Sequence, residues 1–274
     1  MNEIELLFTD ILNCKRHDLY LNKYISLDKQ KRRFLNRALM RRFNGEPIQY
    51  ILGKAEFMGL EFKVNKDVFI PRPETEILVE AVINCVSPLA RSCLPAGRCP
   101  VCPLKILEIG TGSGCIAISL AKFLRVNVTA TDISNLALEV AKQNALLNNV
   151  EINLLKSDLF MSCELGVGSS EIIVSNPPYI PSTDMKDLPL EVRNEPVFAL
   201  DGGKDGIDIY RRIIKECPRY LKDYGYLIME IGFGQCQTLK NIFKNSGKLE
   251  IIDIVRDYNN IERVIVAQKK KWIN

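Results

Sequence analysis

The stretch Lys105-Ile-Leu-Glu-Ile-Gly-Thr-Gly-Ser-Gly114 decides the fold. Its apolar half has the composition of a buried strand, and three glycines at alternate positions precede a helical pattern. Glycines let the backbone turn tightly and approach a ligand closely where a helix begins. The stretch therefore predicts a strand, a tight turn and a helix, with the turn either binding a ligand or serving only as a connection.

Strands and helices alternate on the C-terminal side of this turn. Further apolar runs lie at 126–131, 151–155, 171–175 and 225–231, and helical patterns at about 114–124, 134–147 and 206–221. This alternation predicts a parallel sheet with helices on both faces. The last two apolar runs, Leu249–Val255 and Arg263–Ala267, are joined by a connector too short for a crossover helix, so they should pair antiparallel.

A carboxylate at the end of the second strand suggests which ligand the turn binds. Asp132 can accept hydrogen bonds from both hydroxyls of a ribose, which NAD and S-adenosyl-L-methionine (AdoMet) share. Cys115 stands where a dinucleotide fingerprint has its third glycine, which disfavours a pyrophosphate ligand. Acidic Glu108 favours a cationic ligand such as AdoMet. The predicted cofactor contacts are Glu108, Gly110, Thr111, Gly112, Ser113, Gly114 and Asp132.

The residues after the third strand are predicted to surround the adenine ring. Asp158 would face the exocyclic amine of the ring, and Leu159 and Phe160 could enclose its faces. An ordinary turn at the end of a strand is the alternative interpretation.

The loop after the fourth strand carries the strongest chemical pattern, Asn176-Pro-Pro-Tyr179. Two prolines fix φ and remove two N–H donors, so the carbonyls around them lack local partners. With the side-chain carbonyl of Asn176 they offer acceptors to a planar NH₂ group, on which Tyr179 can stack. Accepting both hydrogens orients an amide nitrogen for attack on a methyl group, so this loop is the predicted catalytic element. A proline-rich loop without chemistry is the alternative.

Composition excludes several other classes of protein. The 274 residues are 47% hydrophobic and 26% charged, as in globular chains, and no apolar run is long enough for a membrane span. His17 is the single histidine and lies in a polar stretch that suggests plain surface, which argues against histidine-based catalysis and His-ligated zinc. The start lacks a basic signal-peptide region, and the nine cysteines are therefore expected to be reduced thiols in a cytoplasmic protein.

The positive charge is concentrated at the N-terminus. Residues 1–50 hold 10 of the 37 basic and 6 of the 33 acidic residues, which leaves 27 of each for the remainder of the chain. Residues 28–43 read as one helix with an apolar stripe and a basic surface, and residues 4–12 as another. The basic surface is either a solvated face or a docking face for an acidic protein or RNA.

Residues 53–72 are predicted to link two domains. Residues 55–64 alternate around Gly59 as a β-hairpin, and Pro73 opens a helix that should continue to about Val86. The predicted domains are thus 1–52 and 73–274. Residues 87–104 read as a loop insertion, and its Cys93, Cys99 and Cys102 would permit a zinc knuckle or a disulfide, although a surface loop without metal is favoured.

Together these motifs resemble those of the protein-glutamine N5-methyltransferases, the PrmC/HemK family. The resemblance rests on Pro71-Arg-Pro-Glu-Thr-Glu76, Gly110-Thr-Gly-Ser-Gly114, Asp132, Asn176-Pro-Pro-Tyr179-Ile180, the stretch from Glu195 to Arg211, and Met229-Glu-Ile-Gly232. It covers nearly the whole chain. The Asn-Pro-Pro-Tyr pattern alone is shared with methyltransferases that act on adenine N6 or guanine N2.

The resemblance implies a Rossmann-like, seven-stranded class I AdoMet-dependent methyltransferase domain behind a small helical N-terminal domain and a β-hairpin. It implies methylation of the glutamine amide in the Gly-Gly-Gln motif of class 1 peptide-chain release factors, with AdoMet as donor. The N-terminal domain would bind the release factor, and the enzyme would act as a cytoplasmic monomer without nucleic acid or membrane. The implied substrate contacts are Asn176, Pro177, Pro178, Tyr179, Arg72 and Glu76, with Asn176 also near the donor and Leu159 near the adenine.

Two other functions remain open from the sequence. One is methylation of ribosomal protein L3 or of a nucleic-acid base, although a base methyltransferase should carry a basic catalytic domain, and residues 51–274 are neutral. The other is a nucleoside-binding or scaffold protein without activity, against which the intact Asn176–Tyr179 loop, glycine turn and Asp132 argue.

Overall fold

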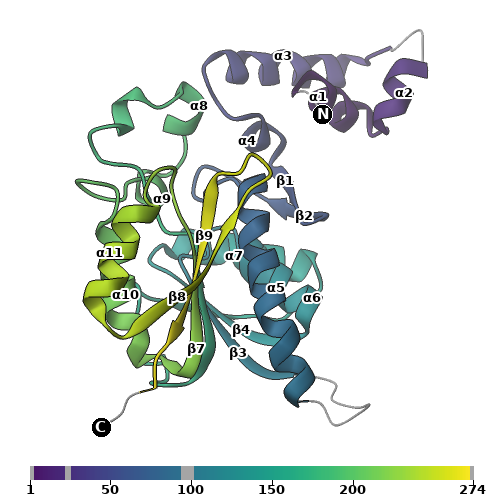
Figure 1. Ribbon diagram of the computed structural model, residues 1–274. Helices are drawn as coiled ribbons and strands as arrows, with labels where there is room; N and C mark the ends of the chain where they lie inside the picture. Colours follow the sequence, from purple (N-terminus) through teal and green to yellow (C-terminus); the bar gives the residue numbers. More distant parts are fainter. Residues whose placement is uncertain (1–2, 22–25, 94–101, 272–274) are drawn as a thin grey trace.

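The N-terminal part of the chain is a small group of helices (Figure 1). The computed structural model describes residues 3–21, 26–93 and 102–271. The first four helices are α1 (Glu3–Leu12), α2 (Arg16–Leu21), α3 (Lys29–Phe43) and α4 (Ile48–Leu52). Asp28 starts α3 by accepting a hydrogen bond from the Lys31 amide at 2.8 Å, as its cap role requires. The helices bury a separate apolar cluster of their own: Leu7, Ile11, Ala38, Ile48 and Ile51.

A β-hairpin follows, formed by β1 (Lys54–Phe57) and β2 (Leu60–Lys63) in antiparallel register, as the sequence predicted. Its Met58-Gly59 turn has positive φ at both residues. The hairpin is tied to the C-terminal part of the chain through Asn144, whose side chain accepts from the Lys63 amide at 2.7 Å and donates to the Lys63 carbonyl at 2.9 Å. Phe57 and Phe62 then pack edge to face in the main core.

Replacing Phe62 by alanine should lower the free energy of unfolding by about 3–5 kcal/mol, because its ring is fully buried. Phe123→Ala is the control, since that ring is 46% exposed and its loss should change stability by less than about 1 kcal/mol. Urea unfolding of the two variants measures both values. Equal losses would contradict the assignment of Phe62 to the core.

Seven strands form the main sheet, in the order β5-β4-β3-β6-β7-β9-β8. Their bounds are β3 (Cys102–Ile109), β4 (Val126–Asp132), β5 (Asn153–Lys156), β6 (Ser170–Ser175), β7 (Leu221–Glu230), β8 (Leu249–Arg256) and β9 (Glu262–Lys269). The first five are parallel to one another, and β9 is antiparallel to both β7 and β8. The predicted parallel sheet and its final antiparallel pair are confirmed.

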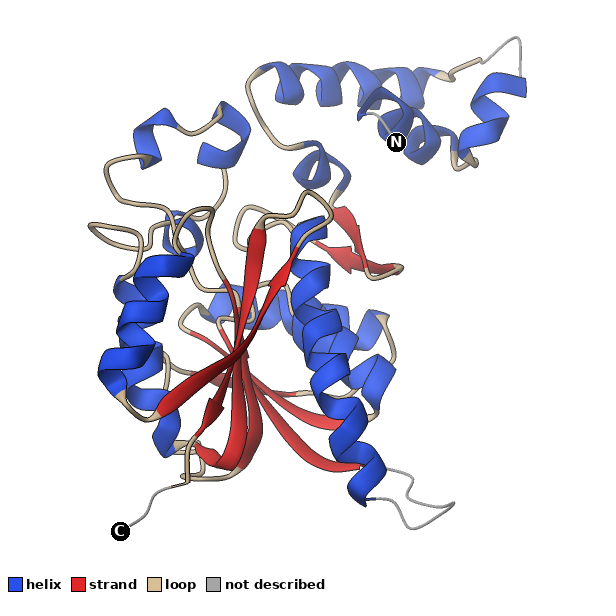
Figure 2. Cartoon of the chain, viewed as in Figure 1, coloured by secondary structure: helices blue, strands red, loops and turns tan. Residues whose placement is uncertain are grey.

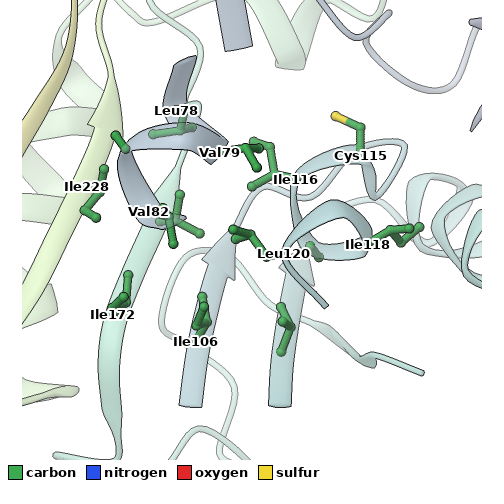
Figure 3. Packing of buried hydrophobic residues seen from close by; sticks show 14 of the residues in the cluster. Leu78, Val79, Val82, Ile106, Cys115, Ile116, Ile118, Leu120, Ile172 and Ile228 are labelled. Atoms are coloured by element: carbon green, nitrogen blue, oxygen red, sulfur yellow. The ribbon is translucent and has the colours of Figure 1, made fainter. Parts of the chain in front are cut away.

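Helices cover both faces of this sheet (Figure 2). They are α5 (Pro73–Cys93), α6 (Cys115–Leu124), α7 (Asn135–Leu147), α10 (Asp208–Glu216) and α11 (Cys236–Ser246). On one face, side chains of α5 and α6 meet those of β3, β6 and β7, for example Leu78, Leu120 and Ile172 (Figure 3). On the other face, α10 and α11 pack through Ile213, Leu239 and Phe243. The central strands, such as β6, are therefore buried between two apolar layers, which fits their apolar sequences.

Short helices occupy the segment between β6 and α10. They are α8 (Leu190–Arg193), α9 (Val197–Leu200) and the 3₁₀ turn Met185–Asp187; a further 3₁₀ turn, Cys217–Arg219, precedes β7. The N-terminal helices contact the rest of the chain at α8 and the residue that follows it. Arg42 pairs with Glu191 at 2.6 Å, and the Asn194 side chain donates to the Gly45 carbonyl at 3.0 Å.

Two predictions about the helices need correction. The helix predicted to end near Val86 continues to Cys93, with Pro88 inside it. The loop prediction over 87–104 is therefore wrong for residues 87–93, which belong to α5, and for residues 102–104, which belong to β3. The remaining residues, 94–101, lie outside the described ranges. The sequence analysis also missed α11. No helix in the described part of the chain is long and apolar enough to cross a membrane.

Candidate functional site

A cavity of about 610 Å³ opens at the carboxyl ends of the parallel strands. Ligands of α/β proteins bind at this edge, where the loops after neighbouring strands converge. Its wall contains most of the predicted site residues: Gly110, Thr111, Gly112, Ser113, Asp132, Asp158, Leu159, Asn176, Pro177, Pro178 and Tyr179. The fold thus brings the glycine turn, the carboxylate of β4 and the Asn-Pro-Pro-Tyr loop to one place.

The glycine turn is held against Asp132. Gly110 and Gly112 have φ of +76° and +54°, which a residue with a Cβ adopts only with strain. The Asp132 carboxylate accepts from the Gly112 amide at 2.8 Å through one oxygen and from the Ser134 amide at 2.9 Å through the other. Its burial raises its pKa, and backbone hydrogen bonds oppose that increase. Each oxygen keeps a further lone pair that can accept from a ribose hydroxyl.

Glu108, predicted to face the cofactor, does not line the cavity. Its side chain is fully buried below the turn and accepts from the Thr111 hydroxyl at 2.6 Å and from the Ala117 amide at 3.1 Å. Burial raises its pKa to about 7. The side chain therefore braces the turn and the start of α6, because the side chain of a strand residue with both faces of the sheet covered points into the core.

Gly114, also predicted to contact the cofactor, lies outside the cavity wall as well. A Cβ atom on it would lie 2.9 Å from the Ile118 side chain and 3.2 Å from the Ala141 backbone. This glycine is thus required for the close packing of α6 on α7, with its φ of +83°, rather than for an approach to ligand.

The segment after β5 reaches the cavity only in part. Leu159 lines it with a φ of +51°, and Asp158 lines it while paired at 2.9 Å with Arg212 from α10. Phe160, predicted to cover the adenine, turns into the core and stacks on Tyr220 with ring centroids 4.7 Å apart. That prediction is wrong, because the apolar core under α10 offers the ring complete burial.

The Asn176–Tyr179 loop lines the cavity and contains main-chain carbonyls without a hydrogen-bond partner among the described residues. The carbonyls of Tyr179 and Ile180 accept from Gln235 Nε2 at 2.9 Å and from the Gly202 amide at 2.8 Å. Among the described residues, no hydrogen bond is made to the main-chain carbonyls of residues 176–178. The loop is thus anchored at Tyr179 and Ile180, and the carbonyls of residues 176–178 keep their capacity to accept a hydrogen bond.

The Tyr179 ring is part of the cavity wall and packs on the apolar cluster under α10. Burial raises the pKa of its phenol to about 12, so the ring stays neutral. It can therefore cover a flat polar group without adding charge.

Arg72 and Glu76, predicted to contact substrate, do not line the cavity. The Arg72 guanidinium forms an ion pair with buried Glu195 and lies over the Phe69 ring at 4.8 Å. The Glu76 carboxylate accepts from the Met58 amide at 2.6 Å. Both side chains therefore tie segments of the chain together, and the structure offers no support for their predicted contact with substrate.

Several polar residues of the wall were not predicted from the sequence, among them Thr75 and Arg212. Thr75 is 2% exposed at the start of α5, and its hydroxyl accepts from Asn176 Nδ2 at 3.1 Å. Its position inside the Pro71–Glu76 motif was a signal that could have indicated it. Arg212 carried no signal, because it is one of several basic residues on an amphipathic helix.

Among the described cysteines and the histidine, Cys115 alone lies in the cavity wall, and burial raises the pKa of its thiol to about 12. His17 is exposed, as expected. Cys14, Cys85, Cys115, Cys163, Cys217 and Cys236 are free thiols. The described residues contain no cluster of three or more metal-ligating side chains, and the Cys93, Cys99 and Cys102 side chains lie outside what the structure describes.

Two family models match the chain. Residues 1–53 match the PrmC N-terminal domain, and residues 100–191 match the methyltransferase small domain. Among solved structures, the hMettl16 catalytic domain superposes with a TM-score of 0.61 at 17% identity, covering 83% of this chain and 84% of that one. A methyltransferase from Pyrococcus furiosus has a TM-score of 0.57, also at 17% identity, over 89% of this chain and 100% of that one. These likenesses confirm the class I methyltransferase fold.

Curated relatives match at higher identity. The release factor glutamine methyltransferase of Geobacter sulfurreducens is 38% identical over 96% of this chain and 87% of its own length. The enzyme of the same name from Fusobacterium nucleatum is 36% identical over 97% of this chain and 73% of its own length. A bifunctional methyltransferase of Rickettsia felis is 37% identical, and the match covers 53% of that longer protein. The chain therefore belongs to the family of release factor glutamine methyltransferases.

Proposed function

We propose that this protein transfers a methyl group from AdoMet to the side-chain amide nitrogen, N5, of the glutamine in the Gly-Gly-Gln motif of class 1 release factors. The observation that carries the proposal is the Asn176–Tyr179 loop, whose free carbonyls share one cavity with the glycine turn and Asp132. The names of the relatives, which specify a release factor glutamine, supply the substrate.

The wall of the cavity fits AdoMet. Asp132 closes β4 with two carboxylate oxygens for the ribose, and the backbone of Gly110–Gly112 can approach the ligand without side chains between them. Leu159 and Ile133 provide apolar surface for the adenine, beside the Asp158 carboxylate. When bound, AdoMet supplies an electrophilic methyl group on a sulfonium sulfur.

The Asn176–Tyr179 loop can make the glutamine amide of the substrate a better nucleophile. A glutamine amide is a poor nucleophile, because its nitrogen lone pair is delocalised into the carbonyl. Carbonyl oxygens of the loop and Asn176 Oδ1 can accept both N–H hydrogens, which orients the nitrogen and raises its electron density. The rate enhancement then comes from positioning and electrostatics, and no histidine base takes part.

The N-terminal domain, residues 1–52, is the part that binds the release factor in this proposal. On α3 the side chains of Lys29, Lys31, Arg32, Arg33 and Arg37 make no ion pair with any described residue. The same helix exposes Met40 by 64% and Phe43 by 87%. A cationic face with an apolar end suits an acidic protein surface that has an apolar anchor point. The enzyme would act as a monomer in the cytoplasm, without direct contact to nucleic acid, consistent with the neutral charge of residues 51–274.

Reversing the charge of the cationic face of α3 should weaken binding of the release factor without lowering kcat. We expect the triple variant Arg32→Glu, Arg33→Glu, Arg37→Glu to raise KM for the release factor by about tenfold or more at low salt, with kcat within about twofold. The matched control carries the same charge change on the catalytic part: Lys142→Glu, Lys215→Glu, Lys244→Glu. An equal rise in KM for the control would assign the effect to net charge instead of to α3.

The function itself is tested by incubation with labelled AdoMet and a class 1 release factor. Label should enter the wild-type factor and be absent when the glutamine of its Gly-Gly-Gln motif is replaced. Mass spectrometry of the tryptic peptide should place one methyl group on the glutamine side chain. Label that persists on the altered factor, or that enters only ribosomal protein L3 or RNA, would overturn the proposal.

A further inference from the structure

A buried carboxylate lies directly behind the site, and nothing in the proposed function so far uses it. Glu230 ends β7, is 4% exposed, and has one carboxylate oxygen, Oε2, with no hydrogen-bond partner among the described residues. Burying a carboxylate in this way is unfavourable unless its interactions compensate. Its burial raises its pKa to about 7.

The sheet register places this carboxylate beside the Asn176–Tyr179 loop. β6 and β7 are parallel neighbours in which Ser175 lies opposite Met229, so Asn176 and Glu230 lie side by side one residue later, where the two strands end. Thr75 completes the group from the first turn of α5. Asn176 Nδ2 donates to Thr75 Oγ1 at 3.1 Å. The Thr75 and Asn176 side chains lie close enough to the Glu230 carboxylate for both to lower its pKa, against the larger increase from burial.

The chemistry of the three groups gives this arrangement a direction. An ionised carboxylate can only accept, and the Thr75 oxygen already accepts from Asn176, so the hydroxyl hydrogen of Thr75 is left to point toward Glu230. The amide nitrogen of Asn176 is thereby committed to Thr75, and its Oδ1 is free to face the cavity. A neutral side chain at 230 would permit the reverse direction, in which Thr75 donates to Oδ1 and the amide turns its NH₂ toward the cavity.

We propose that Glu230 and Thr75 are positioning residues, which together hold the Asn176 amide with its oxygen toward the acceptor nitrogen. The inference rests on the proposed function, because an oxygen in that place is useful only to a substrate that donates N–H groups. If the Asn176 amide were turned the other way, its NH₂ group would face the NH₂ group of the substrate. The substrate nitrogen would then lose one of its two hydrogen-bond acceptors.

Ionisation of Glu230 should therefore appear in the pH dependence of turnover. The titratable and charged groups that surround it are Glu74 on α5, Cys115 on α6, Tyr179, Tyr210 on α10 and Arg263 on β9. The raised pKa means that the carboxylate is protonated below about pH 7 and ionised above it. We expect kcat to rise by about tenfold between pH 6 and pH 8, because the ionised fraction rises by that factor.

The test compares Thr75→Val, Thr75→Ser and Glu230→Gln with the wild type in methyl transfer to the release factor. Thr75→Val keeps the shape and loses the hydroxyl, so kcat should fall by about 10- to 100-fold with the Kd for AdoMet unchanged within about threefold. Thr75→Ser restores the hydroxyl and should recover kcat to within about threefold of the wild type. Glu230→Gln should lower kcat by a similar factor and flatten the pH profile.

Three results would overturn the inference: wild-type kcat in Thr75→Val, no recovery in Thr75→Ser, or an unchanged pH profile in Glu230→Gln. AdoMet binding and the thermal midpoint are measured on each variant, and a variant that binds AdoMet normally is folded at the site. A wild-type protein that does not methylate the release factor contradicts the proposed function instead, so the two failures are distinct.

Discussion

Asn176→Ala should abolish most of the turnover and leave cofactor binding nearly intact. The side chain lines the cavity, and its nitrogen is already bonded to Thr75, so the oxygen is the part directed at substrate. Removing one preorganised polar group of this kind lowers kcat by about 10²- to 10³-fold. The dissociation constant for AdoMet should change by less than about threefold, since Asp132 and the glycine turn remain.

Steady-state methyl transfer to the release factor, together with calorimetric titration of AdoMet, separates the two quantities. Asn245→Ala is the matched control, because this asparagine is exposed on α11, away from the cavity. If turnover and AdoMet affinity fell by the same factor, Asn176 would be a cofactor residue and the assignment of its oxygen to substrate would be wrong.

Gly202→Ala should be almost as damaging, although the residue touches neither proposed ligand site directly. A Cβ on Gly202 would lie 2.7 Å from the Gly206 carbonyl oxygen, 2.8 Å from the Pro178 oxygen and 2.8 Å from Tyr179 Cα. All three are backbone atoms, so the Asn176–Tyr179 loop must move to admit one methyl group. A displacement of about 1 Å at reacting groups lowers the rate by about 10²-fold, and we expect that loss in kcat.

The control for this variant is Gly166→Ala, where the added Cβ meets only the Ser169 side chain at 3.1 Å. Neither glycine has the positive φ that would strain an alanine, so the pair isolates crowding from backbone conformation. Retained AdoMet affinity in Gly202→Ala would locate the damage at the loop. Unchanged kcat would mean that the position of the carbonyls is not critical.

Local sequence patterns predicted the fold well where the structure is determined by residues close together in the chain. The glycine turn requires positive φ, and the apolar runs of β3 and β6 are buried as central strands, so these elements of residues 105–175 could be predicted from the sequence. The order of the last strands could not, because the connector of residues 257–261 shows that β8 and β9 pair but not which of them adjoins β7.

The loops of the site could be predicted from the sequence, but the residues that hold these loops in place could not. Asp132 and Asn176 follow strands directly, so their place at one edge of a parallel sheet follows from the topology. Glu108 was misjudged because sequence spacing does not tell whether a strand residue faces ligand or core. Thr75 joins Asn176 across 101 residues of chain, and only tertiary packing brings the two together.

The position of β9 has a consequence for how the polypeptide is made. β9 is the last strand in chain order, yet it inserts between β7 and β8 and supplies the neighbour that β7 lacks. During synthesis, the five parallel strands can assemble once residue 230 has emerged, but the outer edge of β7 then keeps its amides and carbonyls unpaired until residues 262–269 follow. Such an edge readily pairs with other chains, so the nascent enzyme passes through a stage at which it is prone to aggregate and Glu230 still lacks the strand beside it.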